Sequence, residues 1–199
     1  MSQILLLQSS LNGPASRTNQ LMERFLQTRR EQGHQDQVVV RDLTVLDLPA
    51  LDSPLFHALR GAEPANEAIQ QAVALSDRLI AELKAADLLL IGAPMYNLNV
   101  PTPLKNWFDL VARARVTFRY TDTYPMGLVE GVNALVFSSR GGVHQGQATD
   151  AVTPYLQSVL GLMGIAEVEF VYAEGMDLHP HGAEQGMREA HARIAGLGR

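Results

Sequence analysis

The sequence has 199 residues, of which 46% are hydrophobic, and this length suits one α/β domain that buries about 70% of its unfolded surface. It contains no cysteine, which excludes disulfides, thiolate nucleophiles, Cys-ligated zinc and iron–sulfur clusters. The net charge of −5 argues against a nucleic-acid-binding protein, which would carry a basic surface. The first apolar run is too short for a signal peptide and no segment is long enough to span a membrane, so we expect a cytoplasmic protein without nucleic-acid or membrane partners.

The first predicted strand leads into a loop rich in hydroxyl groups. Residues 4–7 form an apolar run typical of a buried strand, and helical periodicity begins at Leu21, with Ser16 as a candidate N-cap. The free N–H groups of a helix start attract anions, so we expect a monophosphate site here, without a Walker A lysine or a GxGxxG fingerprint. The simpler alternative is a capped helix behind a turn. The residues that could hold the anion are Ser9, Ser10, Ser16, Arg17, Thr18 and Asn19.

A second candidate loop, polar and stiff, follows a later strand. Residues 38–40 predict the second strand, and residues 43–65 predict an irregular connection. The apolar period between Ile69 and Leu83 predicts a helix. That helix leads into a buried strand at residues 88–91, after which prolines stiffen the loop that holds Met95, Tyr96 and Asn97. Backbone groups of such a loop suit a flat heterocycle, although an ordinary strand–helix connection is the alternative. The next helix buries Leu104, Trp107, Phe108 and Val111.

The second half of the chain continues the alternation. Val116, Phe118 and Tyr120 have strand period, and residues 121–131 read as an excursion that is a lid, a dimer contact or a hairpin packed on its own domain. Residues 133–137 predict a strand followed by Gly141 and Gly142, which allow close approach of a ligand or make a tight turn. A helix at 153–163, a strand at 168–172 and a helix at 183–197 complete the pattern.

Five strands that alternate with helices predict an α/β fold with a parallel sheet, in one domain over residues 1–199. A monophosphate loop after the first strand favours a flavodoxin-like three-layer sandwich with strand order 2-1-3-4-5. Three candidate loops then converge at the carboxyl edge, and flavin mononucleotide (FMN) would use all three. Three other classes of protein with this fold pattern are excluded by residue type. A receiver domain would need an acidic cluster at the strand ends, and a low-molecular-weight phosphatase would need a cysteine. A metallohydrolase would need clustered metal ligands, but the histidines are scattered, so we predict no metal site.

Seven motifs, in order and spacing, resemble the FMN-dependent NADH:quinone oxidoreductases, also called FMN-dependent NADH-azoreductases. The resemblance covers almost the whole chain, most loosely across residues 43–66, and implies a homodimer with one FMN per subunit and an active site at the subunit interface. The motifs are Ser9-Ser10, Ser16-Arg17-Thr18, residues 93–97, residues 104–113, residues 117–120, residues 139–142 and residues 153–155.

The resemblance also implies the site residues. Those assigned to FMN are Ser10, Ser16, Arg17, Thr18, Met95, Tyr96, Asn97, Leu98, Ser139, Arg140, Gly141 and Gly142. Those assigned to the substrate pocket are Asn97, Leu98, Phe118, Tyr120 and Leu162. Many family members carry an aromatic residue at the position of Leu98, so this chain departs from the pattern in the shape of its substrate pocket.

The implied reaction uses NADH as electron donor, with NADPH left open, to reduce quinones and to cleave azo compounds. NADH would pass a hydride to N5 of FMN, and the acceptor would then occupy the same place, which gives ping-pong kinetics. We predict no catalytic side chain beyond a minor proton-donating role for His144. The alternative is a flavodoxin-like electron carrier or redox-sensing FMN-binding protein, but the excursion at residues 113–131 favours an enzyme, because a carrier needs an open flavin edge.

Overall fold

The computed structural model describes residues 1–197, so residues 198 and 199 of the predicted domain lie outside the described residues. Its centre is a five-stranded sheet in which all pairings are parallel and the order is β2-β1-β3-β6-β7. Counted along the sheet's own strands, this is the predicted order 2-1-3-4-5, which is therefore confirmed. The strands are β1 (Gln3–Gln8), β2 (Gln37–Asp42), β3 (Leu88–Gly92), β6 (Asn133–Ser139) and β7 (Val168–Ala173).

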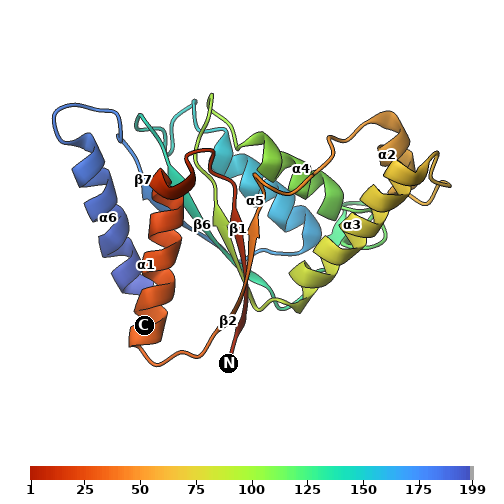
Figure 1. Cartoon of the computed structure of the whole chain (residues 1–199), viewed down its shortest axis with the longest axis horizontal. Coiled ribbons are helices and arrows are strands. Elements are labelled where there is room, and N and C mark those ends of the chain that lie inside the picture. The colour runs from red at the N-terminus through yellow and green to blue at the C-terminus, as the bar shows by residue number, and fades with distance from the viewer. Residues whose placement is uncertain (198–199) are drawn as a thin grey trace.

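Helices cover both faces of the sheet, as Figure 1 shows: α1 and α6 lie on one face, and α3, α4 and α5 on the other. Each predicted long helix is present. None of the helices within residues 1–197 is both long and apolar enough to cross a membrane. The helices are α1 (Arg17–Glu31), α2 (Ser53–Ala58), α3 (Glu67–Ala85), α4 (Thr102–Val111), α5 (Val152–Met163) and α6 (Gly182–Leu197), with a short 3-10 turn, η1 (Gly13–Ala15), before α1.

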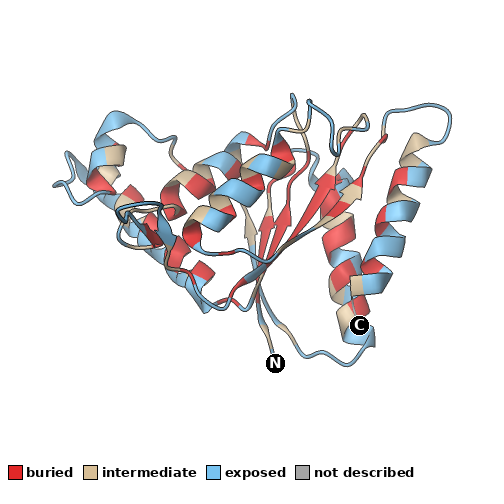
Figure 2. Ribbon diagram, turned by 180° about the vertical axis from the view of Figure 1, so that it is seen from behind, coloured by how far each residue is buried: buried red, intermediate tan, exposed pale blue. Residues whose placement is uncertain are grey.

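The hydrophobic core has two parts, one on each face of the sheet (Figure 2). Because successive strand residues point to opposite faces, Leu5 and Leu7 join the α3–α5 side, whereas Ile4 and Leu6 join the α1–α6 side. On α4 the predicted face is fully buried, with Trp107 0% exposed. A sheet buried on both faces explains why its central strands are continuous apolar runs rather than alternating ones.

The excursion after α4 is a hairpin of two short strands, β4 (Phe118–Arg119) and β5 (Met126–Gly127). The expected strand across residues 116–120 is thus only partly correct, since the preceding residues form a turn in which Arg115 has φ of 70°. Within the chain the hairpin packs on the end of α5, where the N–H of Val129 donates to the carbonyl of Met163 at 2.9 Å. Its tip is exposed.

The connection between β2 and α3 is more ordered than the sequence pattern indicates. It contains α2, which the carboxylate of Asp52 caps by accepting from the N–H of Leu55 at 2.9 Å. A helix of six residues is too short to show a helical period, and the scattered prolines and glycine of this segment hide it further.

Candidate active site

A cleft of about 330 Å³ lies at the carboxyl edge of the sheet, between the loops that follow β1, β3, β6 and β7. Ligands bind at this edge in open parallel sheets, because adjacent strands end there and their loops diverge. Six of the residues predicted to bind FMN line it: Arg17, Met95, Tyr96, Ser139, Arg140 and Gly141. The other lining residues are Asn12, Ala15, Pro94, Met176, Asp177 and Ala183.

The loop after β1 ends in a capped helix, as predicted. The Ser16 hydroxyl accepts from the N–H of Asn19 at 3.1 Å and lies 3.1 Å from the Thr18 hydroxyl, and both hydroxyls are buried. The N–H groups of Arg17 and Thr18 occupy the first two helical positions, where helix geometry provides no backbone acceptor. Two amide donors and the positive end of the helix dipole therefore remain for an anion.

The two serines at the end of β1 have different roles. The Ser9 hydroxyl donates to the carbonyl of Gly92 at 2.6 Å, so it joins the ends of β1 and β3. The Ser10 hydroxyl lies 3.2 Å from the Tyr96 hydroxyl, which also accepts from the N–H of Leu11 at 3.1 Å. Tyr96 consequently joins the loop after β1 to the loop after β3.

The loop after β3 closes in a tight turn. The N–H of Tyr96 donates to the carbonyl of Asn99 and the reverse bond also forms, both at 3.0 Å. Asn97 and Leu98 between them have φ of 50° and 64°, which is typical of a type I′ turn. The N–H of Met95 donates to the Ser139 carbonyl, so among the described hydrogen bonds only the N–H groups of Asn97 and Leu98 in this stretch remain available to a ligand.

The loop after β6 is held by the loop after β7. The carbonyls of Arg140, Gly141 and Gly142 accept from the N–H groups of three consecutive residues, Met176, Asp177 and Gly175, at 2.9–3.0 Å. The N–H groups of the two glycines, by contrast, have no acceptor among the described residues. A Cβ at Gly142 would lie 2.8 Å from Nε2 of His144, so a larger residue there would require the His144 ring to shift.

The Arg140 side chain points away from the cleft, although its backbone lines it. Its guanidinium is 0% exposed and forms ion pairs with Asp150 at 3.1 Å and Glu174 at 3.3 Å. Burial alone would raise the pKa of Asp150, but hydrogen bonds from Arg140 and Thr153 outweigh it and lower that pKa. Burial raises the pKa of the neighbouring Tyr172, whose ring lies 4.7 Å from the guanidinium.

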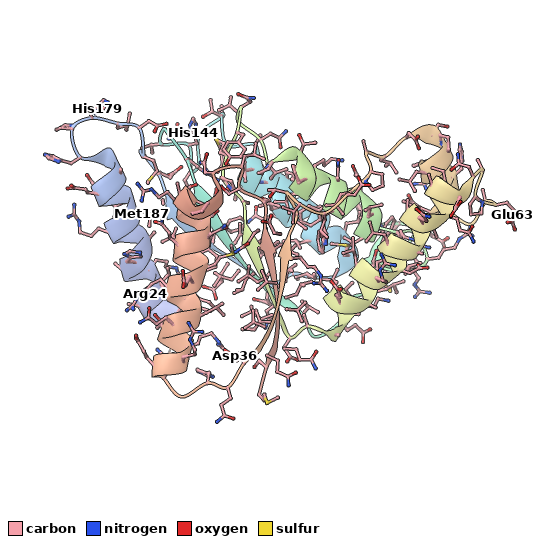
Figure 3. All side chains as sticks on the ribbon, in the orientation of Figure 1. Arg24, Asp36, Glu63, His144, His179 and Met187 are labelled. Atoms are coloured by element: carbon pink, nitrogen blue, oxygen red, sulfur yellow. The ribbon has the colours of Figure 1, made fainter. Side chains whose placement is uncertain are left out.

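His144 lies at the edge of the sheet that bears the cleft, as does His179 (Figure 3). The ring of His144 shares a hydrogen bond with the Thr149 hydroxyl, 2.8 Å from Nδ1, and its Nε2 faces the backbone of Gly142. The ring thus stands beside the glycines rather than over the cleft floor. A role for His144 as a proton donor remains a prediction.

Three predicted substrate-pocket residues lie away from this cleft within one chain. Helix α5 runs from the carboxyl edge toward the opposite edge, so Leu162 near its end is about 15 Å along the helix from the cleft side. Phe118 and Tyr120 belong to the hairpin that packs on that same end. Phe118 is 5% exposed, and Tyr120 is 65% exposed with its ring edge-on to Phe118.

Sequence reasoning missed the loop after β7, which supplies Met176, Asp177 and the start of α6 to the cleft. The available signal was the rule that loops at the carboxyl ends of neighbouring strands share one edge, because the last strand lies next to β6. It also missed Glu174, which follows β7 directly. No local pattern marks that residue, since its partners are 29 to 34 positions away in the sequence.

The donors of the cleft fit FMN. A terminal phosphate needs N–H and hydroxyl donors at a helix start, which the beginning of α1 provides. The pyrimidine end of a flavin presents carbonyl oxygens, which the amides of residues 97–98 and 141–142 suit. The absence of side chains at the two glycines allows a flat ring to approach the backbone closely.

A family model described as a flavodoxin-like fold matches residues 2–197. The chain is 66% identical over 197 residues to FMN-dependent NADH:quinone oxidoreductase 4 of Burkholderia lata, with 99% of each chain covered. It is 51% identical over 197 residues to the FMN-dependent NADH:quinone oxidoreductase of Aeromonas salmonicida, again with 99% of each chain covered. Among solved structures, an azoreductase of Bacillus anthracis matches with a TM-score of 0.87 and 28% identity, over 100% of this chain and 99% of that one.

Proposed function

Because the chain belongs to the flavodoxin-like family of FMN-dependent NADH:quinone oxidoreductases, we propose that it uses FMN and NADH to reduce quinones to hydroquinones and to cleave aromatic azo compounds to amines. The observation that carries this proposal is the cleft at the carboxyl edge, where three predicted loops present unpaired backbone donors. One FMN per chain would occupy it.

When bound, FMN would supply the redox chemistry, namely hydride transfer through N5 from NADH to an acceptor on the same face, for which we expect ping-pong kinetics. The N–H groups of Arg17 and Thr18 and the hydroxyls of Ser16 and Thr18 would hold the phosphate. The amides of Asn97 and Leu98, which have no acceptor among the described hydrogen bonds, would donate to the ring. Backbone donors aimed at developing negative charge need no reorganisation during the reaction, so they favour the reduced flavin.

Gly141 and Gly142 would hold the pyrimidine end of the ring. Their carbonyls are already engaged by the loop after β7, and their N–H groups, which have no acceptor among the described residues, would donate to the ligand. No side-chain nucleophile is needed, which agrees with the lack of cysteine. Solvent or His144 delivers the proton that the product requires.

The first experiment is a visible absorption spectrum of the purified protein, followed by anaerobic addition of NADH. A yellow protein that bleaches fully in one two-electron step supports the enzyme. A yellow protein that NADH leaves oxidised supports the alternative, an electron carrier or redox sensor. A colourless protein that takes up no added FMN contradicts the assignment of the cleft.

We also propose that two chains form a dimer in which the hairpin of each subunit covers the cleft of the other. The hairpin cannot reach its own cleft, yet its tip exposes Tyr120 (65%), Tyr124 (80%) and Met126 (48%). Large aromatic side chains on a surface are typical of interfaces. In the dimer, Phe118, Tyr120 and Leu162 would complete the substrate pocket beside Asn97 and Leu98.

Tyr120→Ala tests this arrangement. We expect a higher KM or a lower kcat for quinones, with unchanged stability of the isolated fold because the side chain is exposed. Tyr124→Ala is the matched control from the same hairpin and should have a smaller effect. If Tyr120→Ala leaves both KM and kcat at wild-type values, the hairpin does not cover the pocket.

A further inference from the structure

A buried cluster of charges lies directly behind the Gly141–Gly142 loop. At its centre the Arg140 guanidinium donates to the Ser138 hydroxyl at 3.2 Å and the Thr153 hydroxyl at 2.9 Å, in addition to its two carboxylate partners. These partners come from β6, from the segment before α5, from α5 itself and from the end of β7. The arginine therefore joins several elements at the carboxyl edge of the sheet.

Glu174 connects this cluster to the backbone of the loop after β6. Its Oε1 accepts from Arg140 at 3.3 Å and from the N–H groups of His144 and Gln145, each at 2.8 Å. One oxygen atom thus fixes both the guanidinium and the far end of the loop. The side chain is 14% exposed, and hydrogen bonds to ionised groups are roughly twice as strong as neutral ones.

The loop is consequently tied at both ends. Arg140 is anchored by its side chain at the beginning, and Gly141 and Gly142 are anchored by the N–H groups of Asp177 and Gly175. His144 and Gln145 are anchored by Glu174 at the end. The carbonyls of both glycines are therefore engaged, whereas their N–H groups have no acceptor among the described residues.

The charge of the cluster shows that Arg140 does not itself stabilise a negative ligand. One guanidinium faces two carboxylates, Asp150 and Glu174, so the three groups together carry a charge of −1. The guanidinium also stacks on the face of Tyr172 and has no exposed surface. Any contact of this loop with the flavin would therefore be made by backbone amides and not by the arginine charge.

We propose that Glu174, together with Arg140, is a positioning residue that holds the loop after β6 so that the N–H groups of Gly141 and Gly142 are available to FMN. This inference rests on the proposed function, since it takes FMN as the ligand. Neither side chain touches the flavin; each acts through the loop. Disruption of the cluster should weaken FMN binding because the amides would have to be ordered when the ligand binds.

The central test compares Glu174→Ala with Glu174→Gln. Alanine removes the acceptor, whereas glutamine keeps an oxygen for the amides of His144 and Gln145 and removes only the charge. The matched control is Asp36→Ala, which breaks a similarly buried ion pair with Arg29 at the opposite edge of the sheet (Figure 3). The readouts are the Kd for FMN, from quenching of flavin fluorescence by the apoprotein, and the hydrogen exchange of the amides of His144 and Gln145.

We expect Glu174→Ala to raise the Kd for FMN by about tenfold or more, the effect of losing a few net hydrogen bonds, and to speed the exchange of both amides. Glu174→Gln should recover most of the affinity, and Asp36→Ala should lower the Tm without changing the Kd. The proposal is overturned if Glu174→Ala keeps the wild-type Kd, or if Asp36→Ala raises the Kd equally.

Two further measurements keep the test decisive. If Glu174→Ala does not fold, Thr153→Val removes another partner of Arg140 while preserving shape; a raised Kd supports the proposal and an unchanged Kd overturns it. If the wild-type protein binds no FMN, the proposed function fails. Amide exchange in the apoprotein would still decide whether Glu174 orders the loop.

Discussion

At the scale of single residues, Leu98 adopts a backbone conformation that its side chain disfavours. Its φ is 64°, in the left-handed region, and it is 44% exposed. That conformation costs a residue with a Cβ roughly 1–2 kcal/mol. Strain of this kind persists at functional sites when the surrounding structure imposes it, and here the turn leaves the amides of Asn97 and Leu98 without an acceptor, beside the cleft-lining Met95 and Tyr96.

Leu98→Asn should therefore stabilise the apoprotein by up to about 1 kcal/mol, because asparagine tolerates the left-handed region better than leucine does. The same substitution should raise the KM for quinones, since it removes apolar surface from the proposed pocket. Urea unfolding and steady-state kinetics measure the two effects.

Leu51→Asn is the control for the loss of exposed leucine surface. Leu51 is 39% exposed and has a negative φ, so this substitution should give no gain in stability. An equal gain from both variants would mean that the strain at Leu98 is not responsible.

At the scale of elements, the beginning of α1 combines a structural and a binding role. The Ser16 cap stabilises the helix, and its hydroxyl lies beside that of Thr18 at the proposed phosphate site. The beginning of α3 has a comparable cap, in which the side chain of Asn66 accepts from the N–H of Ile69 at 3.0 Å. Only the first cap lies at the cleft, so the two can be compared.

Ser16→Ala and Asn66→Ala should each destabilise the fold by about 1 kcal/mol, the usual effect of losing an N-cap side chain. Only Ser16→Ala should also raise the Kd for FMN. The measurements are urea unfolding of the apoproteins and FMN titration at a temperature where both variants are folded. A similar rise in Kd for both would assign the effect to stability alone.

At the scale of the whole molecule, two partly buried aspartates at opposite edges of the sheet make stability depend on acid pH. The hydrogen bond from Arg29 holds the pKa of Asp36 below its usual value despite burial. For Asp150, bonds from Arg140 and Thr153 outweigh the effect of burial and likewise lower the pKa. A carboxyl whose pKa is lower when folded stabilises the protein above its unfolded pKa, and this stability is lost as the pH falls through the folded value.

We expect the contribution of these two carboxyls to the free energy of unfolding to be constant above the ordinary aspartate pKa of about 4 and to decrease at lower pH. Asp36→Asn should be less stable than wild type at neutral pH, and the two should converge as Asp36 becomes protonated at acid pH. Urea unfolding across this range measures both curves. A constant difference at every pH would show that ionisation of Asp36 does not contribute.

The sequence by itself determined the architecture. A parallel strand buried on both faces must be apolar along its whole length, so residues 4–7 and 88–91 could be recognised without their neighbours. The Ser16 cap and the buried face of α4 follow from contacts within three or four residues, which sequence spacing reports directly. The motifs were sufficient to identify the family because their order and spacing along the chain can be read from the sequence.

Only the tertiary structure decided which groups of the predicted loops are available to a ligand. The N–H groups of Met95 and Tyr96 are engaged within the protein, whereas those of Asn97 and Leu98 are not. The sequence also did not indicate the direction of the Arg140 side chain, the contacts of Glu174, or the distance of the hairpin from its own cleft. Each depends on a partner far away in the sequence, and hydrogen bonds between distant residues form only after the sheet has brought the strand ends together.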